Sequence, residues 1–328
     1  MDTELVLTNL SNLIGVEHVL TQEKELAFFS ADLFIEGMPP KAVIAPRTCD
    51  ELVEAVKLCN TAGLAILPRG GGLSYTAGYI QSDPNLETIV IDTRRLNKVL
   101  DVNHDNMTIT VQSGCTWEQI SEASAMHGLR VTMPGPTTGR YSTIGGSISN
   151  NCMFFSSAKT GTSADAVLGL QIVTADGTII TTGSGAIKKG VAFFRNNGPD
   201  LTGLFLSDAG SLGVKITATL RLEPIPKGTA FKSIAFNTFE QMIPAIQAIG
   251  RSGLASECLA TGPIADGAGP MLHITVEGCT QDIADSQLTA LMSLIDSNGK
   301  EEDPIIPIFI VVVLFFFFNH HQPSNFWA

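Results

Sequence analysis

The sequence of 328 residues has few basic residues, since 20 Lys and Arg stand against 32 Asp and Glu, and the formal net charge is −12. This balance argues against a nucleic-acid partner, whose phosphates would be repelled rather than neutralised. Charged residues make up only 16% of the chain and hydrophobic residues 44%. Such a composition is typical of a packed globular protein, and the length allows two domains of ordinary size.

Pairs of metal-ligating or disulfide-forming residues are also lacking. The six cysteines form no C-x-x-C pair, and the six histidines are scattered except for His320 and His321. This usage indicates no zinc site and is typical of a reducing compartment with mostly buried free thiols. The first ten residues lack a basic region and a continuous apolar core, so we expect no secretory signal and a cytoplasmic protein, with peripheral membrane association left open.

Neither of two common nucleotide-binding motifs is present. Three glycines follow an apolar run, in Pro68-Arg-Gly-Gly-Gly-Leu-Ser-Tyr75, but a Rossmann motif would need glycine at Tyr75, and no P-loop Gly-Lys-Ser/Thr occurs. The glycines fit either a flexible turn or a nest of backbone N–H groups that holds a pyrophosphate. A second segment of small residues, 134–150, provides many backbone donors and hydroxyls, and two such loops suggest one long, charged, extended ligand.

Apolar periodicity and turn residues predict the elements of the first two thirds of the chain. Thr48 is expected to cap the second helix in a capping box with Glu51. The stretch 134–151 is expected to be loop, and Glu223-Pro-Ile-Pro marks a domain boundary. The helices are predicted at 3–14, 49–61 and 117–127, and the strands at 42–45, 64–67, 88–91, 98–102, 107–112, 168–174, 178–182 and 214–222.

The part after the boundary has a different pattern. Strand 231–236, helix 239–250, strands 256–260 and 271–277 and helix 281–297 follow one another. This order predicts a ferredoxin-like sheet that lacks its last strand. Residues 304–318 are abruptly apolar but fall short of the roughly 20 residues that a membrane-spanning helix needs. We therefore favour a truncated or frame-shifted end over a membrane anchor.

Four blocks of sequence together resemble a known family. They are Pro68–Ser74, Thr143–Asn150, Gly161–Gly177, and Gly198–Phe205 followed by Asp208–Val214. In this order and spacing they resemble the FAD-binding domain of the vanillyl-alcohol oxidase and p-cresol methylhydroxylase (PCMH) type. They are most similar to the branch with the glycolate oxidase flavin subunit and cytochrome-linked D-lactate dehydrogenase.

The resemblance implies a fold of class α+β. A two-subdomain PCMH-type FAD-binding domain would span residues 25–225, after an N-terminal helical segment at 1–24. A partial ferredoxin-like substrate (cap) domain would follow at 226–300, and an atypical apolar tail at 301–328. The family's substrate domain is considerably longer than this one, so the resemblance puts the completeness of the active site in doubt.

The resemblance also implies which residues contact FAD. Leu73 stands where many relatives have a histidine bonded covalently to the flavin, so we expect non-covalent FAD, with Cys152 as the alternative tether. Valine at Gly71 or Gly145 is expected to block the approach of the pyrophosphate and remove FAD. The implied cofactor-binding residues are Arg69, Gly70, Gly71, Gly72, Leu73, Ser74, Tyr75, Pro134, Thr143, Ile144, Gly145, Gly146, Ser149, Asn150, Gly161, Ala164, Asp165 and Val214.

The implied activity is FAD-dependent oxidation of a 2-hydroxy acid or related alcohol by hydride transfer to flavin N5. The catalytic residues are unknown, with two candidates. His273 is either a proton acceptor or a sheet histidine with satisfied hydrogen bonds, and Arg69 is either an anion-binding group or a surface charge. A truncated or partner-dependent FAD-binding protein without independent activity is the alternative function. The partners would be a small-molecule substrate, an electron acceptor of unknown identity, and a second copy or partner subunit.

Overall fold

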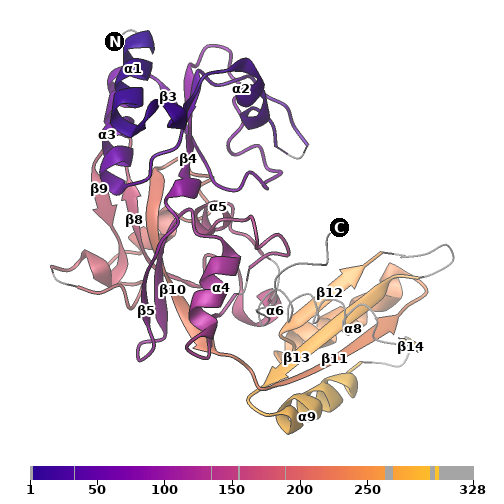
Figure 1. The fold of residues 1–328 in the computed structure, drawn as a ribbon. Helices are drawn as coiled ribbons and strands as arrows, with labels where there is room; N and C mark the ends of the chain where they lie inside the picture. The colour runs from indigo at the N-terminus through magenta and orange to yellow at the C-terminus, as the bar shows by residue number, and fades with distance from the viewer. Residues whose placement is uncertain are drawn as a thin grey trace.

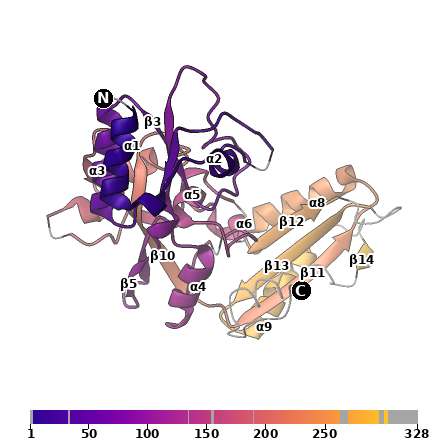
Figure 2. The same cartoon turned by 45° about the horizontal axis from the view of Figure 1, so that its top comes forward.

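The structure is a computed structural model that describes residues 3–32, 34–133, 135–153, 156–188, 190–262, 269–295 and 300–302. Figure 1 shows a larger lobe, formed by residues 3–224, and a smaller lobe, formed by residues 228–302, beside its lower end. The same separation is visible after rotation in Figure 2. The apolar tail at 304–318 lies outside the described residues. No helix in the described ranges is long and apolar enough to cross a membrane.

The first sheet of the larger lobe contains the strand that leads into the glycine loop. Its order is β1 (Val19–Leu20), β2 (Ala42–Ile44), β4 (Thr88–Asp92) and β3 (Ala65–Arg69). Strands β2 and β3 both run parallel to β4, and every residue of β2 and β4 is buried, as expected of parallel strands covered on both faces. Helices α1 (Thr3–Ile14) and α3 (Cys49–Thr61) pack on this sheet. Their bounds confirm the predicted helices.

The N-terminus of α3 differs in one detail from the predicted capping box. The Thr48 side chain accepts a hydrogen bond from the Glu51 N–H at 3.1 Å, as predicted. The Glu51 carboxylate, however, accepts from the N–H of Arg47 rather than of Thr48. The predicted box is therefore half correct, because the acidic side chain reaches one residue further back.

The second sheet of the larger lobe is antiparallel throughout. Its order is β5-β6-β10-β8-β9, and β7 pairs with the end of β10. The central β10 contributes Val214 and Ile216 to one apolar core and Ala218, Leu220 and Leu222 to the other. The strands are β5 (Val99–Asn103), β6 (Thr108–Gln112), β7 (Leu129–Val131), β8 (Val167–Val173), β9 (Ile179–Thr181) and β10 (Val214–Pro224). Further helices of the lobe include α2 (Glu23–Phe29), α4 (Trp117–Ala125), α6 (Ser157–Thr160) and α7 (Leu201–Leu204).

The expected loop at 134–151 contains a helix, α5 (Ile144–Ser149), so that part of the prediction was wrong. Ile144 and Ile148, four residues apart, are both fully buried in the core. Thr143 caps the helix by accepting from the Gly146 N–H at 3.4 Å. Burial of this apolar pair stabilises the helix although glycine and serine disfavour one, because tertiary packing overrides local propensity.

The smaller lobe has one four-stranded antiparallel sheet of order β12-β13-β11-β14 with both helices on one face (Figure 1). This is the ferredoxin-like order. The fourth strand, which the sequence prediction omitted, is present but only three residues long. Its charged sequence carries no apolar alternation, which suits a short edge strand. The elements are β11 (Gly228–Ala235), α8 (Phe239–Ser252), β12 (Glu257–Thr261), β13 (Met271–Gly278), α9 (Gln281–Met292) and β14 (Lys300–Glu302).

Candidate functional site

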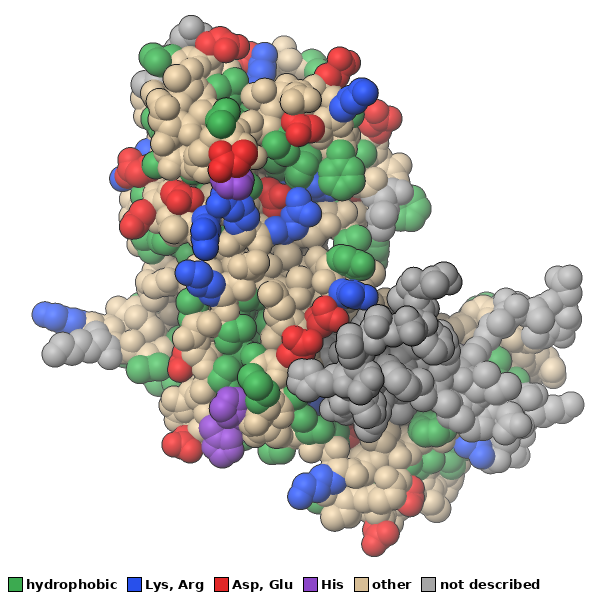
Figure 3. Space-filling view, viewed as in Figure 1, with side chains coloured by type: hydrophobic (Ala, Val, Ile, Leu, Met, Phe, Trp, Pro, Cys, Tyr) green, Lys and Arg blue, Asp and Glu red, His purple; other side chains and the backbone are tan. Residues whose placement is uncertain are grey.

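A cavity of about 490 Å³ lies where three loops of the larger lobe meet. The first loop follows β3, the second includes Pro136–Thr138 and the start of α5, and the third precedes β10. Both glycine-rich segments noted in the sequence therefore contribute to one cavity. In the view of Figure 3 the surface of the larger lobe carries charged side chains of both signs with apolar side chains between them.

The two glycine loops touch each other directly. A Cβ atom at Gly70 would lie 2.0 Å from Oγ1 of Thr143, and one at Gly71 would lie 2.1 Å from the carbonyl oxygen of Tyr141. A Cβ atom at Gly145 would lie 2.8 Å from Cβ of Ser113. Glycine is thus required at these positions for contact between protein segments. Valine at Gly71 or Gly145 would therefore clash with neighbouring protein atoms rather than with a bound pyrophosphate, which corrects the reason expected from the sequence.

Gly146 has different surroundings. A Cβ atom there would have only Oγ1 of Thr143 within 4 Å, at 3.4 Å, and Gly146 lines the cavity. Its φ is not positive, so the backbone itself does not demand glycine. The bare Cα at this position therefore leaves room for a bound group in the cavity.

Most of the residues predicted to contact FAD line this cavity, but several do not. Ile144 is buried in the core, and Pro134 lies outside the described residues. The segment Gly161–Asp165 does not line the cavity. It contacts the cavity wall instead, because the Ser163 hydroxyl donates to the carbonyl oxygen of the lining residue Ser147 at 2.9 Å. The predicted residues that do line it are Arg69, Gly70, Gly71, Gly72, Leu73, Ser74, Tyr75, Thr143, Gly145, Gly146, Ser149, Asn150 and Val214.

Further lining residues were missed by sequence reasoning. Ser113 lies in no pattern of the sequence, and nothing in the sequence showed that Lys215 on β10 lies against the cavity. Ser147, Pro136–Thr138 and Ala209–Gly210 belong to the glycine-rich segment 134–150 or to the block Asp208–Val214, so the composition of those segments could have identified them.

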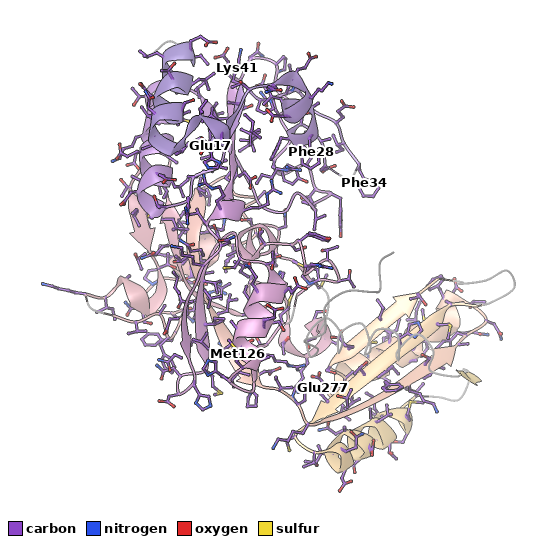
Figure 4. All side chains as sticks on the ribbon, viewed as in Figure 1. Glu17, Phe28, Phe34, Lys41, Met126 and Glu277 are labelled. Atoms are coloured by element: carbon purple, nitrogen blue, oxygen red, sulfur yellow. The ribbon has the colours of Figure 1, made fainter. Side chains whose placement is uncertain are left out.

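Arg69 is buried in the cavity wall, with 5% of its surface exposed, so the alternative of a surface charge was wrong. Its guanidinium carbon lies 4.5 Å from the ring centroid of Phe29, 5.1 Å from that of Phe28 and 5.2 Å from that of Tyr79. Figure 4 labels Phe28, which belongs to α2. Burial lowers the pKa of Arg69.

Two polar atoms in the wall lack a partner. Nε of Arg69 and Oγ of Ser113 are buried and make no hydrogen bond within the part of the chain that the structure describes. Both residues line the cavity. Since buried polar groups are normally satisfied, these atoms are suited to a polar ligand in the cavity.

The electrostatics of the wall favour an anion. Lys215 is paired with Asp208 at 2.6 Å, and both side chains are almost fully buried. Burial lowers the pKa of Lys215, and the Asp208 charge opposes that shift. No Asp or Glu is among the described residues that line the cavity, and Arg69 makes no ion pair with another described residue.

Two further predicted residues have clear surroundings. Burial raises the pKa of the Cys152 thiol to about 11, so this cavity-lining residue is a neutral thiol near pH 7. His273 on β13 is buried, with Nδ1 2.9 Å from Oγ of Ser233 and Nε2 3.1 Å from Oγ1 of Thr261. Burial lowers its pKa. This arrangement favours the interpretation of a sheet histidine with satisfied hydrogen bonds.

Comparison with known proteins identifies the domain that carries the cavity. Residues 40–183 match the family described as FAD binding domain. The glycolate oxidase subunit GlcD of Bacillus subtilis is 36% identical over 188 residues, which cover 57% of this chain and 38% of that protein. An uncharacterized FAD-linked oxidoreductase, Rv2280, of Mycobacterium tuberculosis is 30% identical over 252 residues, covering 76% of this chain and 52% of that protein. The chain thus spans only about a third to a half of the length of these relatives.

Solved structures show the same fold. An alkyldihydroxyacetonephosphate synthase has a TM-score of 0.76 at 17% identity, covering 92% of this chain and 61% of that chain. A p-cresol methylhydroxylase with substrate bound also has a TM-score of 0.76 at 17% identity, covering 92% of this chain and 66% of that chain. Residues 40–183 therefore match an FAD binding domain, and the fold is of the PCMH type, as the sequence blocks predicted.

Proposed function

We propose that the cavity between the glycine loops binds FAD, and that this chain is the flavin-binding part of an oxidoreductase acting on a 2-hydroxy acid. The observation that carries the proposal is the cavity wall itself. It is lined by small residues and bare backbone, contains two unpartnered polar atoms, and has cationic but no acidic side chains among its described residues. Such a wall suits a ligand with a pyrophosphate.

The residues that would hold FAD follow from their positions. The backbone around Gly70–Gly72 and Gly146 would face the pyrophosphate or ribose, and the Thr143 and Ser113 hydroxyls would provide hydrogen bonds. Arg69 would provide positive charge at the wall, whereas the charge of Lys215 is compensated by Asp208. When bound, FAD supplies a ring whose N5 accepts a hydride from the substrate carbon. The loops would shield it from water and fix its orientation.

The substrate class comes from the names of the relatives. They include the glycolate oxidase subunit, a D-lactate dehydrogenase of Archaeoglobus fulgidus at 31% identity over 65% of this chain, and a D-2-hydroxyglutarate dehydrogenase of Xanthomonas citri at 26% identity over 74% of this chain. Glycolate, lactate and 2-hydroxyglutarate are all 2-hydroxy acids. We extend this class to the present chain, with an electron acceptor that a second copy or a partner subunit would provide.

A second candidate function is an FAD-binding protein without independent activity. It is favoured by the state of the candidate catalytic residues, because both ring nitrogens of His273 are hydrogen bonded and the Arg69 guanidinium is packed among aromatic rings. In this arrangement neither ring nitrogen of His273 is free to take a proton from a substrate hydroxyl, and the protonated Arg69 guanidinium is not a base.

One spectroscopic experiment separates these functions. The purified chain should show the flavin absorption bands with about one FAD per chain. Anaerobic addition of glycolate, D-lactate or D-2-hydroxyglutarate should bleach these bands if the chain is an active dehydrogenase, with L-lactate testing stereoselectivity. Bound flavin that no hydroxy acid bleaches would support the inactive alternative. A colourless chain that takes up no FAD would contradict the proposed cofactor site.

A further inference from the structure

The first glycine loop ends in a turn that forms part of the cavity wall. Thr76 and Gly78 both line the cavity, and Ala77 between them has a φ of 57°. Residues other than glycine rarely adopt this left-handed region, and such backbone persists only where its surroundings hold it in place. The Thr76 hydroxyl donates to Oδ1 of Asn150, at the end of α5, at 3.0 Å. The conformation at Ala77 therefore determines how the first loop meets α5 in the cavity wall.

The backbone N–H of Ala77 donates to a carboxylate from an earlier part of the chain. The acceptor is Oδ2 of Asp32 at 3.0 Å, and the two residues are 45 positions apart in the sequence. Asp32 lies in the segment that follows α2, on which Figure 4 labels Phe34. Asp32 is partly exposed and is not among the described residues that line the cavity. Its side chain thus contacts the cavity wall through the Ala77 N–H.

The other oxygen of the same carboxylate holds its own segment in place. Oδ1 of Asp32 accepts from the N–H groups of Phe34 and Ile35, both at 2.8 Å. The N–H of Asp32 in turn donates to the carbonyl oxygen of Ile35 at 2.9 Å. The Phe34 hydrogen bond, against the opposing effect of burial, lowers the pKa of Asp32, so both oxygens are acceptors near pH 7. The Phe34 ring also lies edge-on to that of Tyr75 in the first loop, with 6.0 Å between centroids.

We propose that Asp32 is a positioning residue for the cofactor cavity. By accepting from the Ala77 N–H, it holds the left-handed turn that joins the first glycine loop to α5. The inference rests on the proposed binding of FAD. Without this acceptor, an alanine at position 77 should leave the left-handed region, which costs an L-residue about 1–2 kcal/mol. A glycine there would populate the same conformation without help. The effect of removing the carboxylate should therefore depend on which residue stands at position 77.

The test compares Asp32→Ala in the wild-type and in the Ala77→Gly backgrounds. We expect Asp32→Ala to weaken FAD binding about tenfold in the wild type and to make the bound flavin more accessible to quenching by iodide. In the Ala77→Gly background the same substitution should weaken binding by no more than about threefold. Asp83→Ala is the matched control, because Asp83 accepts from the Asn85 N–H at 2.9 Å in a turn between β3 and β4 and does not line the cavity. It should leave affinity and quenching unchanged.

Hydrogen exchange provides a measurement that needs no variant. In the wild type the Ala77 N–H should exchange more slowly than the N–H groups of exposed loops, and fast exchange would overturn the inference. Wild-type affinity in an Asp32→Ala variant that urea unfolding shows to be folded would overturn it as well. So would an equal loss of affinity in both backgrounds, because Asp32 would then act by a route other than Ala77. Failure of the wild type to bind FAD would instead overturn the proposed function, and this inference with it.

Discussion

At the scale of single residues, two glycines of the facing loops have opposite surroundings. Gly71 is pressed against the Tyr141 carbonyl, whereas Gly146 faces open space in the cavity. The same kind of substitution should therefore damage the fold at one position and only the ligand site at the other.

We predict that Gly146→Leu abolishes FAD binding while the unfolding free energy of the FAD-free chain changes by no more than about 1 kcal/mol, since removal of a helical glycine offsets the bulk of the new side chain. Gly71→Ala should lose both binding and stability. Gly250→Leu is the matched control, because Gly250 lies in α8 with nothing within 4 Å of its missing Cβ. Equilibrium dialysis with FAD and urea unfolding measure the two quantities. Wild-type affinity in Gly146→Leu would show that the ligand lies elsewhere.

The attachment of the flavin is also decided by single residues. Leu73 offers no imidazole, and the raised pKa of Cys152 leaves little thiolate to attack a flavin. We predict that acid precipitation releases all the yellow colour into the supernatant, from the wild type and from Cys152→Ser alike. Flavin that stays with the precipitated wild-type chain but not with Cys152→Ser would identify a cysteine tether.

The sequence could predict some of these residues but not others. Glycine clusters and their spacing identified the two loops, because glycine at close contacts is a local requirement. The position of Arg69 among Phe28, Phe29 and Tyr79 depends on a helix forty residues earlier, and no local pattern reports such a contact. Lys215 was missed for the same reason, since its partner Asp208 and its burial are set by tertiary packing.

At the scale of elements, α5 depends on its cap. Thr143 accepts from the Gly146 N–H and also lies against Gly70 of the facing loop. We predict that Thr143→Ala lowers the unfolding free energy by about 1 kcal/mol, the usual effect of a lost N-cap, and weakens FAD binding. Thr143→Ser keeps the hydroxyl and should restore most of both. Equal loss in the two variants would mean that the methyl group, rather than the cap, is what matters.

The elements that the sequence did not predict share a physical cause. Helix α5 is made of residues that disfavour helices and exists because Ile144 and Ile148 are buried together. Strand β14 is too short and too charged to show a strand pattern, and only its pairing with β11 defines it. The amphipathic helix α3 and the fully buried strand β4 were predicted correctly, because their sequence patterns are themselves the consequence of burial.

At the scale of the whole molecule, the last segment of the chain contributes none of the described residues that line the cavity. Residues 304–318 are β-branched and aromatic, and such a segment promotes aggregation when exposed. We predict that deleting residues 304–328 raises the yield of soluble protein and leaves the amount of FAD per chain unchanged, since none of the described residues that line the cavity is deleted. Loss of flavin on deletion, or recovery of only the full-length chain in washed membranes, would show that the segment is a structural part or an anchor.

Strand β10 contributes to the two larger apolar cores of the larger lobe and pairs with β6, about a hundred residues earlier in the chain. During synthesis, neither core can close until residues 214–224 have emerged from the ribosome. The nascent larger lobe therefore remains open, with β6 and β8 lacking their shared neighbour, until most of the lobe has been translated. Its folding is consequently a late event that seals both cores together.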